Sequence, residues 1–506
     1  PEIQILKHGV KEDTEEHGEN VLGFSPWNSA LSVSSVVQDL DFREIILYPT
    51  LKCCVSRDTR LLLKHALRFN KTGLTMKPLF MMMLLAATPA SHALTVEESA
   101  ALAIRTQPQL LGLYARYESM HSETQSAKGD YLPQVALRAG IGSEKTIYNT
   151  GKKTDTQLTR QDGNLRVTQK VFDGFRTPAN VSRLKYETES ERLGLISAAE
   201  NMLLDVTATY LEVRKQEDIV TLATHNIADH EQVLVDIKSQ LSQGYASESD
   251  IAQVISRLAN ARSSLVAANN NLADARSRYK RLVGQSPEQL ITPQFDARLI
   301  PADPQAAQEL ALDKHPELKA ALADMGASNE EIRVNQASLY PQLNVEAEYN
   351  LEKNQGGFEG RDENGRIMLM LNYDIFNGGR DYHRAQASAW RHQEARSISQ
   401  KARRDVLEGT ELSWHAFQSL GQQLGFLQQS VDAATAAEAG YTQQYKLGRR
   451  TLLDVLNAKI EVFSARRNYL TSQYDHKQAA YRVLNATGQL SYALRVDLPS
   501  QFALRD

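Results

Sequence analysis

Two segments of the chain place the same polar side chains ahead of an apolar helical pattern. They are LSQGYASESDIAQVI, residues 241–255, and YKLGRRTLLDVLNAK, residues 445–459. In each, a glycine stands six residues before an aspartate, and a hydroxyl residue stands three before it. A Ser or Thr with an acid three residues later caps a helix by reciprocal hydrogen bonds, and the carboxylate is favoured by the helix dipole. The chemistry that this spacing supports is hydrogen bonding and charge stabilisation at a helix start.

Both segments also contain the residues needed to end the preceding helix. Ser247 with Asp250, and Thr451 with Asp454, fit the capping pattern. The glycine before each cap supplies the left-handed backbone conformation found just past a helix end, and these glycines are Gly244 and Gly448. We therefore predict that the chain makes the same helix–turn–helix tip twice.

No sequence motif of catalysis or metal binding accompanies these turns. The sequence has no phosphate-binding loop, no G-x-S-x-G, no H-E-x-x-H and no cysteine–histidine spacing. The histidines are scattered, since His225 and His230 are five apart and His383 and His392 are nine apart. We expect no enzyme, no metal site and no cofactor.

Composition narrows the class of protein further. Charged residues are 23% of the 506 residues and the formal net charge is −4, which argues against a nucleic-acid partner. After Ala93 no apolar run approaches the ~20 residues of a membrane-spanning helix, so a helical membrane protein is excluded.

The N-terminal part has the pattern of a targeting sequence. Residues 76–93 combine a lysine, an apolar stretch and small residues before a cleavage point, which is typical of a signal peptide. We interpret residues 1–75 as upstream leader, with a folded N-terminal domain as the alternative. Both cysteines, Cys53 and Cys54, fall in this leader, so the mature chain offers no disulfide and no lipidated cysteine.

The mature chain is a twofold repeat. Pairs that differ by 204 positions include Gly284 with Gly488 and Phe172 with Phe376, while upstream Pro133 and Pro341 differ by 208. Such a period is far longer than that of a solenoid, so it indicates a duplicated domain-sized unit. The predicted parts are a first repeat over 94–284, a linker over 285–300, a second repeat over 301–490 and a tail over 491–506.

Each repeat contains two segments of period-two alternation. They lie within about 133–173 in the first repeat and about 341–377 in the second. In the second, Leu343, Val345 and Ala347 alternate with polar residues, which predicts a strand with one apolar and one polar face. We expect the polar stretches 144–163 and 353–365 to be loops. A half-buried soluble sheet would fit this pattern, but glutamates on its inner face favour the wall of a transmembrane barrel. Four strands cannot close a barrel, which needs at least ~8, so several chains must share it.

Long helical patterns follow the strands, over about 176–284 and 380–488. From Ile251 to Leu282 apolar residues recur every three or four positions without a break, which is the pattern of a coiled-coil seam. The fold class that we predict is mainly α with a small β part, built from long antiparallel helical hairpins whose tips are the two turns.

The repeat, the strand pairs, the very long helices and the signal peptide together resemble the TolC family of outer-membrane export ducts. The second tip, YKLGRRTLLDVLNA, is similar to the family signature Y-x-x-G-x-R-T-x-x-D-V-L-D-A. The resemblance implies a homotrimer with a shared 12-stranded transmembrane β-barrel and a trimeric α-barrel that crosses the periplasm. Strand counting alone would also permit a dimer with eight strands.

The resemblance also implies roles for residues at the tips. Tyr445, Arg450 and Asp454 match the signature and would close or constrict the periplasmic entrance, with Asp250 at the corresponding position of the first repeat. Capping explains the aspartates by itself, whereas it does not explain Tyr445 or Arg450. Asn457 departs from the signature, which has a second aspartate there, so the entrance would carry one ring of three aspartates.

The function implied is a duct in the bacterial outer membrane that docks a periplasmic adaptor and an inner-membrane ABC or RND-type transporter. It would export a protein or a small molecule, and the missing lipid-anchor cysteine is more similar to the secretion and general-purpose members. The alternative is a soluble periplasmic coiled-coil adaptor or scaffold, against which the four alternating strands speak. An outer-membrane enzyme would need a catalytic constellation that the sequence lacks.

Overall fold

A computed structural model describes residues 94–149 and 154–499. The segments interpreted above as leader, 1–75, and signal peptide, 76–93, lie outside the described residues, as does the end of the predicted tail. Within the described part, no helix is both long enough and apolar enough to cross a lipid bilayer.

The helices recur in the same order in both halves of the chain. The first half has α3 (Val96–Thr106), α4 (Pro108–Lys128), α5 (Arg176–Ser242) and α6 (Glu248–Val283). The second half has α7 (Pro304–Lys314), α8 (Pro316–Gln336), α9 (Arg380–Lys446) and α10 (Leu452–Ala486), followed by the short α11 (Leu490–Ala493). Four 3₁₀ turns are η1 (Gly129–Tyr131), η2 (Ala297–Leu299), η3 (Ala337–Leu339) and η4 (Gln355–Gly357). Helices before the strands start 208 positions apart and those after them 204 apart, so the twofold repeat is confirmed.

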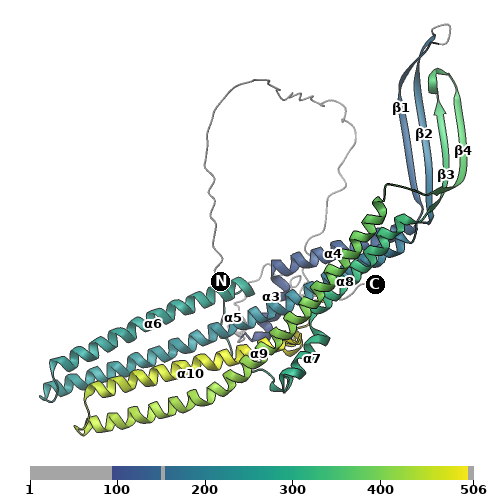
Figure 1. The fold of residues 1–506 in the computed structure, drawn as a ribbon. Coiled ribbons are helices and arrows are strands. Elements are labelled where there is room, and N and C mark those ends of the chain that lie inside the picture. Colours follow the sequence, from purple (N-terminus) through teal and green to yellow (C-terminus); the bar gives the residue numbers. More distant parts are fainter. Residues whose placement is uncertain (1–93, 150–153, 500–506) are drawn as a thin grey trace, which may run out of the picture. The chain divides into compact units, whose positions relative to one another are not determined.

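The four strands form one antiparallel sheet in the order β1-β2-β3-β4. Their bounds are Gln134–Tyr148, Thr154–Phe172, Gln342–Lys353 and Arg361–Asn372. The central pair, β2 with β3, joins the two repeats. The sheet is therefore continuous across the duplication, with β1 and β4 at its edges (Figure 1).

The two faces of the sheet differ in polarity. Val135, Val167, Ala347 and Ile367 lie opposite one another across the four strands, and the outer two side chains are 66% and 79% exposed. The other face carries a row of charges in which Glu348 is buried between two arginines. It forms ion pairs with Arg166 (3.0 Å) and Arg366. One face is thus an exposed apolar surface and the other a paired polar one.

The strands are longer than the sequence pattern predicts. The stretches 144–163 and 353–365 were expected to be loops. In the structure β1 and β2 take up most of the first stretch, and β3 and β4 take up Lys353 and 361–365 of the second, so that only 354–360 connect β3 to β4. This expectation was wrong because these strand segments are polar and lack the apolar alternation by which a strand is predicted. Cross-strand ion pairs, Lys145 with Asp155 (3.0 Å) and Arg160 with Glu144 (3.0 Å), serve here in place of apolar contacts.

The long helices pack along their lengths against shorter ones. On the side away from the sheet, α6, α5, α10 and α9 lie side by side in this order (Figure 1). Toward the sheet, α5 contacts α4 and α8, and α9 contacts α8. The predicted seam of α6 is buried, with Val254 and Tyr279 fully so. Helix α5 is covered on both flanks, whereas α9 keeps exposed apolar residues such as Trp390 and Phe426.

A buried tyrosine makes hydrogen bonds that hold the linker after α6 to the core. The buried Tyr210 hydroxyl of α5 accepts a hydrogen bond from the Ile291 amide (2.9 Å). It lies 2.7 Å from the Ile291 carbonyl and 2.8 Å from the Leu94 carbonyl, to either of which it can donate. Burial raises the pKa of this phenol, so the hydroxyl stays protonated and able to donate.

We expect Tyr210→Phe to lower the free energy of unfolding by about 1 kcal/mol, because the Ile291 amide and the carbonyls of Ile291 and Leu94 lose the hydroxyl that they contact. Thermal unfolding followed by far-ultraviolet circular dichroism measures the loss. Tyr492→Phe is the matched control, since that ring is 73% exposed, and it should change nothing. Equal stability of the two variants would contradict the anchoring role of Tyr210.

Candidate functional site

The first tip joins α5 to α6 through a tight, fully hydrogen-bonded turn. Gly244 has φ of 81°, and the amides of Gly244 and Tyr245 donate to the carbonyls of Leu241 and Gln240, both at 2.9 Å. This pair of bonds is the Schellman pattern that satisfies the last carbonyls of a helix. The positive φ requires glycine here, because a side chain would be strained in this conformation.

The start of α6 is capped by the predicted residues, Ser247 and Asp250. The Ser247 hydroxyl accepts from the Asp250 amide (3.2 Å), and the Asp250 carboxylate accepts from the Ser247 amide (2.9 Å) and hydroxyl (2.7 Å). The carboxylate of Asp250 is thus engaged by its own helix start.

The second tip, between α9 and α10, repeats this geometry. Gly448 has φ of 72°, and the Arg449 amide donates to the Gln444 carbonyl at 2.9 Å. The Asp454 carboxylate accepts from the Thr451 amide (3.1 Å) and hydroxyl (2.8 Å). These hydrogen bonds from Thr451 lower the pKa of the Asp454 carboxyl, and the charge of Arg450 lowers it further.

Tyr445 links the two tips of one chain. Its hydroxyl donates to the Gln240 side-chain oxygen of α5 at 2.8 Å. Its ring packs on an apolar cluster from the other three tip helices, α5, α6 and α10, which has Ile237, Val254, Leu452 and Leu456 as its buried members. Burial raises the pKa of Tyr445, and the nearby charge of Asp250 adds to this. The phenol therefore stays protonated and keeps its donor.

Arg450 makes its contacts within its own hairpin. Its guanidinium donates to the Gln444 side-chain oxygen (3.1 Å), lies 4.3 Å from the centre of the Tyr441 ring, and comes within 3.8 Å of Asp454. A guanidinium over an aromatic face is an attractive arrangement. The structure therefore joins Arg450 to Asp454 and joins Tyr445 to the other hairpin, but it does not pair Asp250 with Asp454.

A second bridge between the hairpins involves the position that departs from the signature. The Asn457 side-chain oxygen of α10 accepts from Arg257 of α6 at 3.2 Å. Together with Tyr445 and Gln240, this contact holds the two tips of one chain against each other.

The sequence pattern did not reveal Gln240 and Tyr441 as partners at the tips. A signal for Gln240 existed, because it stands 204 positions before Gln444, and the two glutamines accept from Tyr445 and Arg450 respectively. Tyr441 had no such signal. In the described ranges, no group of three or more His, Cys, Asp or Glu side chains is placed to hold a metal ion.

Comparison with known proteins matches the chain to one family over both repeats. The family model described as "Outer membrane efflux protein" matches residues 100–285 and 307–489. The outer membrane efflux protein BepC of Brucella suis biovar 1 is 27% identical over 366 residues, 72% of this chain and 79% of that protein. The outer membrane protein TolC of Vibrio cholerae is 22% identical over 396 residues, 76% and 88% of the two chains.

The fold is similar to that of solved channel structures. The crystal structure of CusC, reported with its transmembrane channel formation, superposes with a TM-score of 0.70 at 15% identity and covers 78% of this chain and 92% of that one. At this level of identity the likeness concerns the fold.

We expect Thr451→Ala to destabilise the first turn of α10 by about 1 kcal/mol, because the capping hydroxyl is lost. Hydrogen exchange of the α10 amides should accelerate there by about fivefold. Thr471→Ala, at a half-buried position in the middle of α10, is the control and should leave the exchange of the first turn unchanged. Equal protection in the two variants would show that the cap contributes nothing.

The protection of this turn should also depend on pH. Because folding lowers the pKa of Asp454, the cap stabilises the fold fully above the ordinary carboxyl pKa of about 4. The contribution disappears as the pH falls through the lower pKa of the folded state. In Asp454→Asn this acid-dependent loss of protection should be absent.

Proposed function

The chain belongs to the outer membrane efflux protein family, the family of TolC, and from this we propose that it forms a trimeric export duct. Members of this family are proteins of the outer membrane, and the duct would extend from there into the periplasm. It would pass substrate outward without a catalytic step of its own.

One observation carries the proposal: a four-stranded sheet with an exposed apolar face and two edges that no described strand covers. An exposed apolar face of this kind fits a lipid surface, and the paired charges of Arg166, Glu348 and Arg366 fit a wet lumen. Free edges call for pairing, since open sheet edges do not occur within hydrocarbon. Three copies would supply twelve strands and close the barrel.

The internal repeat supplies the register of the missing contact. Strands β2 and β3 pair across the two repeats, with Leu165 opposite Tyr349. In the neighbouring copy, the equivalent positions are Leu369 on β4 and Ile141 on β1, reached by the offsets of 204 and 208. If the chains assemble as the repeats do, Leu369 of one copy lies opposite Ile141 of the next.

The helices support the same arrangement. Helix α5 is covered by α4 and α8 near the sheet and by α6 and α10 near the tips. Helix α9 contacts α8 and α10, but no described helix lies against it as α4 and α6 lie against α5. The exposed Trp390, Leu412 and Phe426 lie along α9 and are 63–72% exposed. The α4 and α6 helices of a second copy would cover them as α8 and α10 cover α5.

The tips would form the periplasmic entrance and the docking surface. Tyr445, Arg450 and Asp454 at the second tip, with Asp250 at the first, would hold or constrict that entrance. A periplasmic adaptor and an inner-membrane ABC or RND-type transporter would dock there and select the cargo, protein or small molecule. The soluble adaptor alternative leaves the exposed apolar face of the sheet without an explanation.

We expect Leu369→Cys combined with Ile141→Cys to give disulfide-linked oligomers in outer membranes after mild oxidation. Directly opposed strand residues lie about 4.5–5.5 Å apart, within reach of a disulfide. From Met76 on the chain has no other cysteine, so no background thiol competes. A denaturing gel without reductant should show a ladder that ends at three chains.

Leu369→Cys with Val135→Cys is the register control, because it shifts one thiol by six residues, about 20 Å along the strand. It should remain monomeric. A ladder ending at two chains would support the eight-stranded dimer instead, and monomers in both variants would overturn the shared barrel.

We expect Tyr445→Phe combined with Arg450→Ser to raise the single-channel conductance in planar bilayers. The variant removes the bond to Gln240 and the contacts of the guanidinium while it keeps the ring in the apolar cluster. The entrance should therefore open more readily.

Tyr245→Phe combined with Arg449→Ser makes the same chemical change at the same tips and should conduct like the unchanged protein. Normal oligomers with unchanged conductance in the first variant would remove Tyr445 and Arg450 from the entrance.

A further inference from the structure

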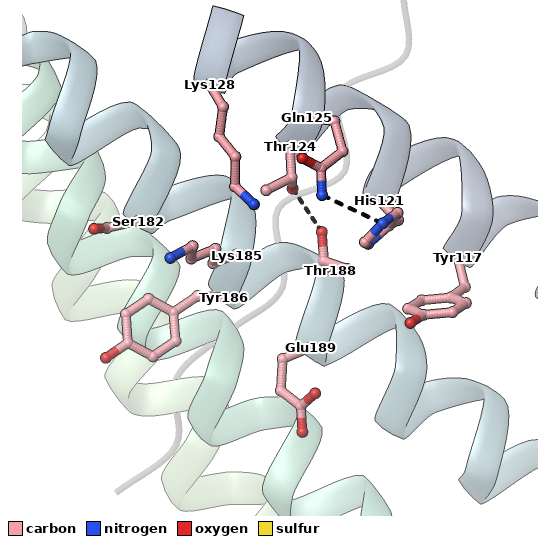
Figure 2. Close-up of a pocket in the computed structure, with 10 residues that line it drawn as sticks. All are labelled: Tyr117, His121, Thr124, Gln125, Lys128, Ser182, Lys185, Tyr186, Thr188 and Glu189. Atoms are coloured by element: carbon pink, nitrogen blue, oxygen red, sulfur yellow. Dashed lines mark hydrogen bonds between the residues drawn. The ribbon is translucent and has the colours of Figure 1, made fainter. Parts of the chain in front are cut away.

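A half-enclosed cavity of about 600 Å³ lies between α4 and α5, on the side of these helices that is close to the sheet. Figure 2 shows its residues along facing turns of the two helices. The volume is within the range of about 300–1,000 Å³ typical of small-molecule sites.

Two lysines stand at the end of this cavity nearest the sheet. Lys128 is the last residue of α4 and extends toward α5, where Lys185 occupies the facing stretch (Figure 2). Within the described part of the chain, no carboxylate forms an ion pair with either ammonium group. The hydroxyl of Ser182 lies at the same end. Two like charges held on neighbouring helices favour an anion between them.

Three rings contribute to the rest of the wall. Tyr117 and His121 line the cavity from α4, with ring centres 6.3 Å apart, and Tyr186 lines it from α5. The Tyr186 ring lies against Gly326 of α8, where an added Cβ would come within 2.9 Å of the ring carbons. Helix α8 therefore contacts one side of this ring, which is 45% exposed.

The remaining polar groups of the cavity are already satisfied. The only carboxylate among its lining residues, Glu189, accepts two hydrogen bonds from Arg192, at 2.7 and 2.8 Å. The hydroxyls of Thr124 and Thr188 bond to each other at 2.9 Å. Gln125 bonds to His121 at 3.4 Å. The lysine pair is what gives the cavity its net positive charge.

The second repeat has the same helices but lacks this charge. The positions equivalent to Lys128 and Lys185 are Gln336 and Ala389, on helices with the same bounds relative to the strands. The packing of the two helices thus forms without the lysines. A requirement of the fold does not explain why the first repeat has both.

We propose that this cavity binds an amphipathic organic anion: a carboxylate, sulfonate or phosphate group between Lys128 and Lys185, with its apolar body against the rings of Tyr117, His121 and Tyr186. The site is separate from the entrance at the tips and goes beyond the proposed export function. Because Lys128 precedes the start of β1 by only six residues, the ligand can come from solution or from lipid headgroups at the membrane surface.

The test uses 1-naphthalenesulfonate as the probe, titrated against the full-length protein in zwitterionic lipid nanodiscs with saturation-transfer NMR as the readout. Its neutral sulfonamide analogue should bind at least about tenfold more weakly, because the analogue has no charge for the lysines. Inorganic phosphate should compete only weakly, since it has no apolar body. Equal binding of sulfonate and sulfonamide would overturn the proposal.

The decisive variant is Lys128→Gln with Lys185→Ala, which installs the residues of the second repeat and is therefore expected to fold. It should weaken binding of the sulfonate about tenfold and leave binding of the sulfonamide unchanged. Lys238→Gln with Lys280→Ala makes the same change of charge at exposed sites far along α5 and α6 and should bind like the unchanged protein. Identical weakening in both variants would reduce the effect to net charge and overturn the site.

The source of the ligand is distinguished by the composition of the bilayer. If nanodiscs with phosphatidylglycerol suppress probe binding in the unchanged protein, the headgroup of an anionic lipid occupies the site. If they do not, the anion comes from solution. Oligomer formation, followed by the cysteine cross-link, reports separately on the duct, so a failed duct and a failed site give different results.

Discussion

The structure depends on keeping two very long helices covered. Helices α5 and α9 are 67 residues each, and a helix of this kind is stabilised mainly by packing of its apolar face rather than by its own propensity. The helices that pack against α5 change halfway along its length. Helices α4 and α8 cover the half near the sheet, and α6 and α10 cover the half near the tips. Helix α5 obtains all four neighbours within its own chain, whereas α9 does not. The single chain therefore covers one long helix on both flanks and leaves apolar residues of the other exposed, such as Trp390 and Phe426.

The sheet follows from the same duplication. Because β2 and β3 pair between repeats, the duplication creates one interface inside the chain, while the outer edges of β1 and β4 have no partner among the described strands. The charges on the polar face are paired within the sheet, with Glu348 held by Arg166 and Arg366. Such pairing lets a carboxylate stay buried without an apolar core beneath it. The charges around Glu348 are thus paired within the sheet, whereas the edge strands β1 and β4 each pair with a described strand on one side only.

Local patterns in the sequence correctly predicted those features that depend on residues close together in the chain. The seam spacing of α6 and the glycine-and-cap turns each depend on residues within a few positions of one another, so periodicity and spacing were enough. The strand ends at 144–163 were missed, because their stability comes from partners such as Arg160 and Glu144 on opposite strands. The bridges from Tyr445 to Gln240 and from Arg257 to Asn457 join residues about 200 positions apart. No local pattern specifies such contacts, and the repeat alone hinted at Gln240.

Comparing the two repeats shows which residues the fold itself requires, because the same helices and turns are built twice from different residues. The capping hydroxyl and aspartate occur at both tips, so building a tip is sufficient reason for them. Tyr445 and Arg450 occur only in the second repeat, where the first has Leu241 and Ala246 in an equally well-formed turn. A side chain absent from one copy is not needed to make the turn. The contacts of Tyr445 and Arg450 therefore need an explanation other than the building of a turn, and for this reason we propose these two residues, ahead of the aspartates, for the entrance.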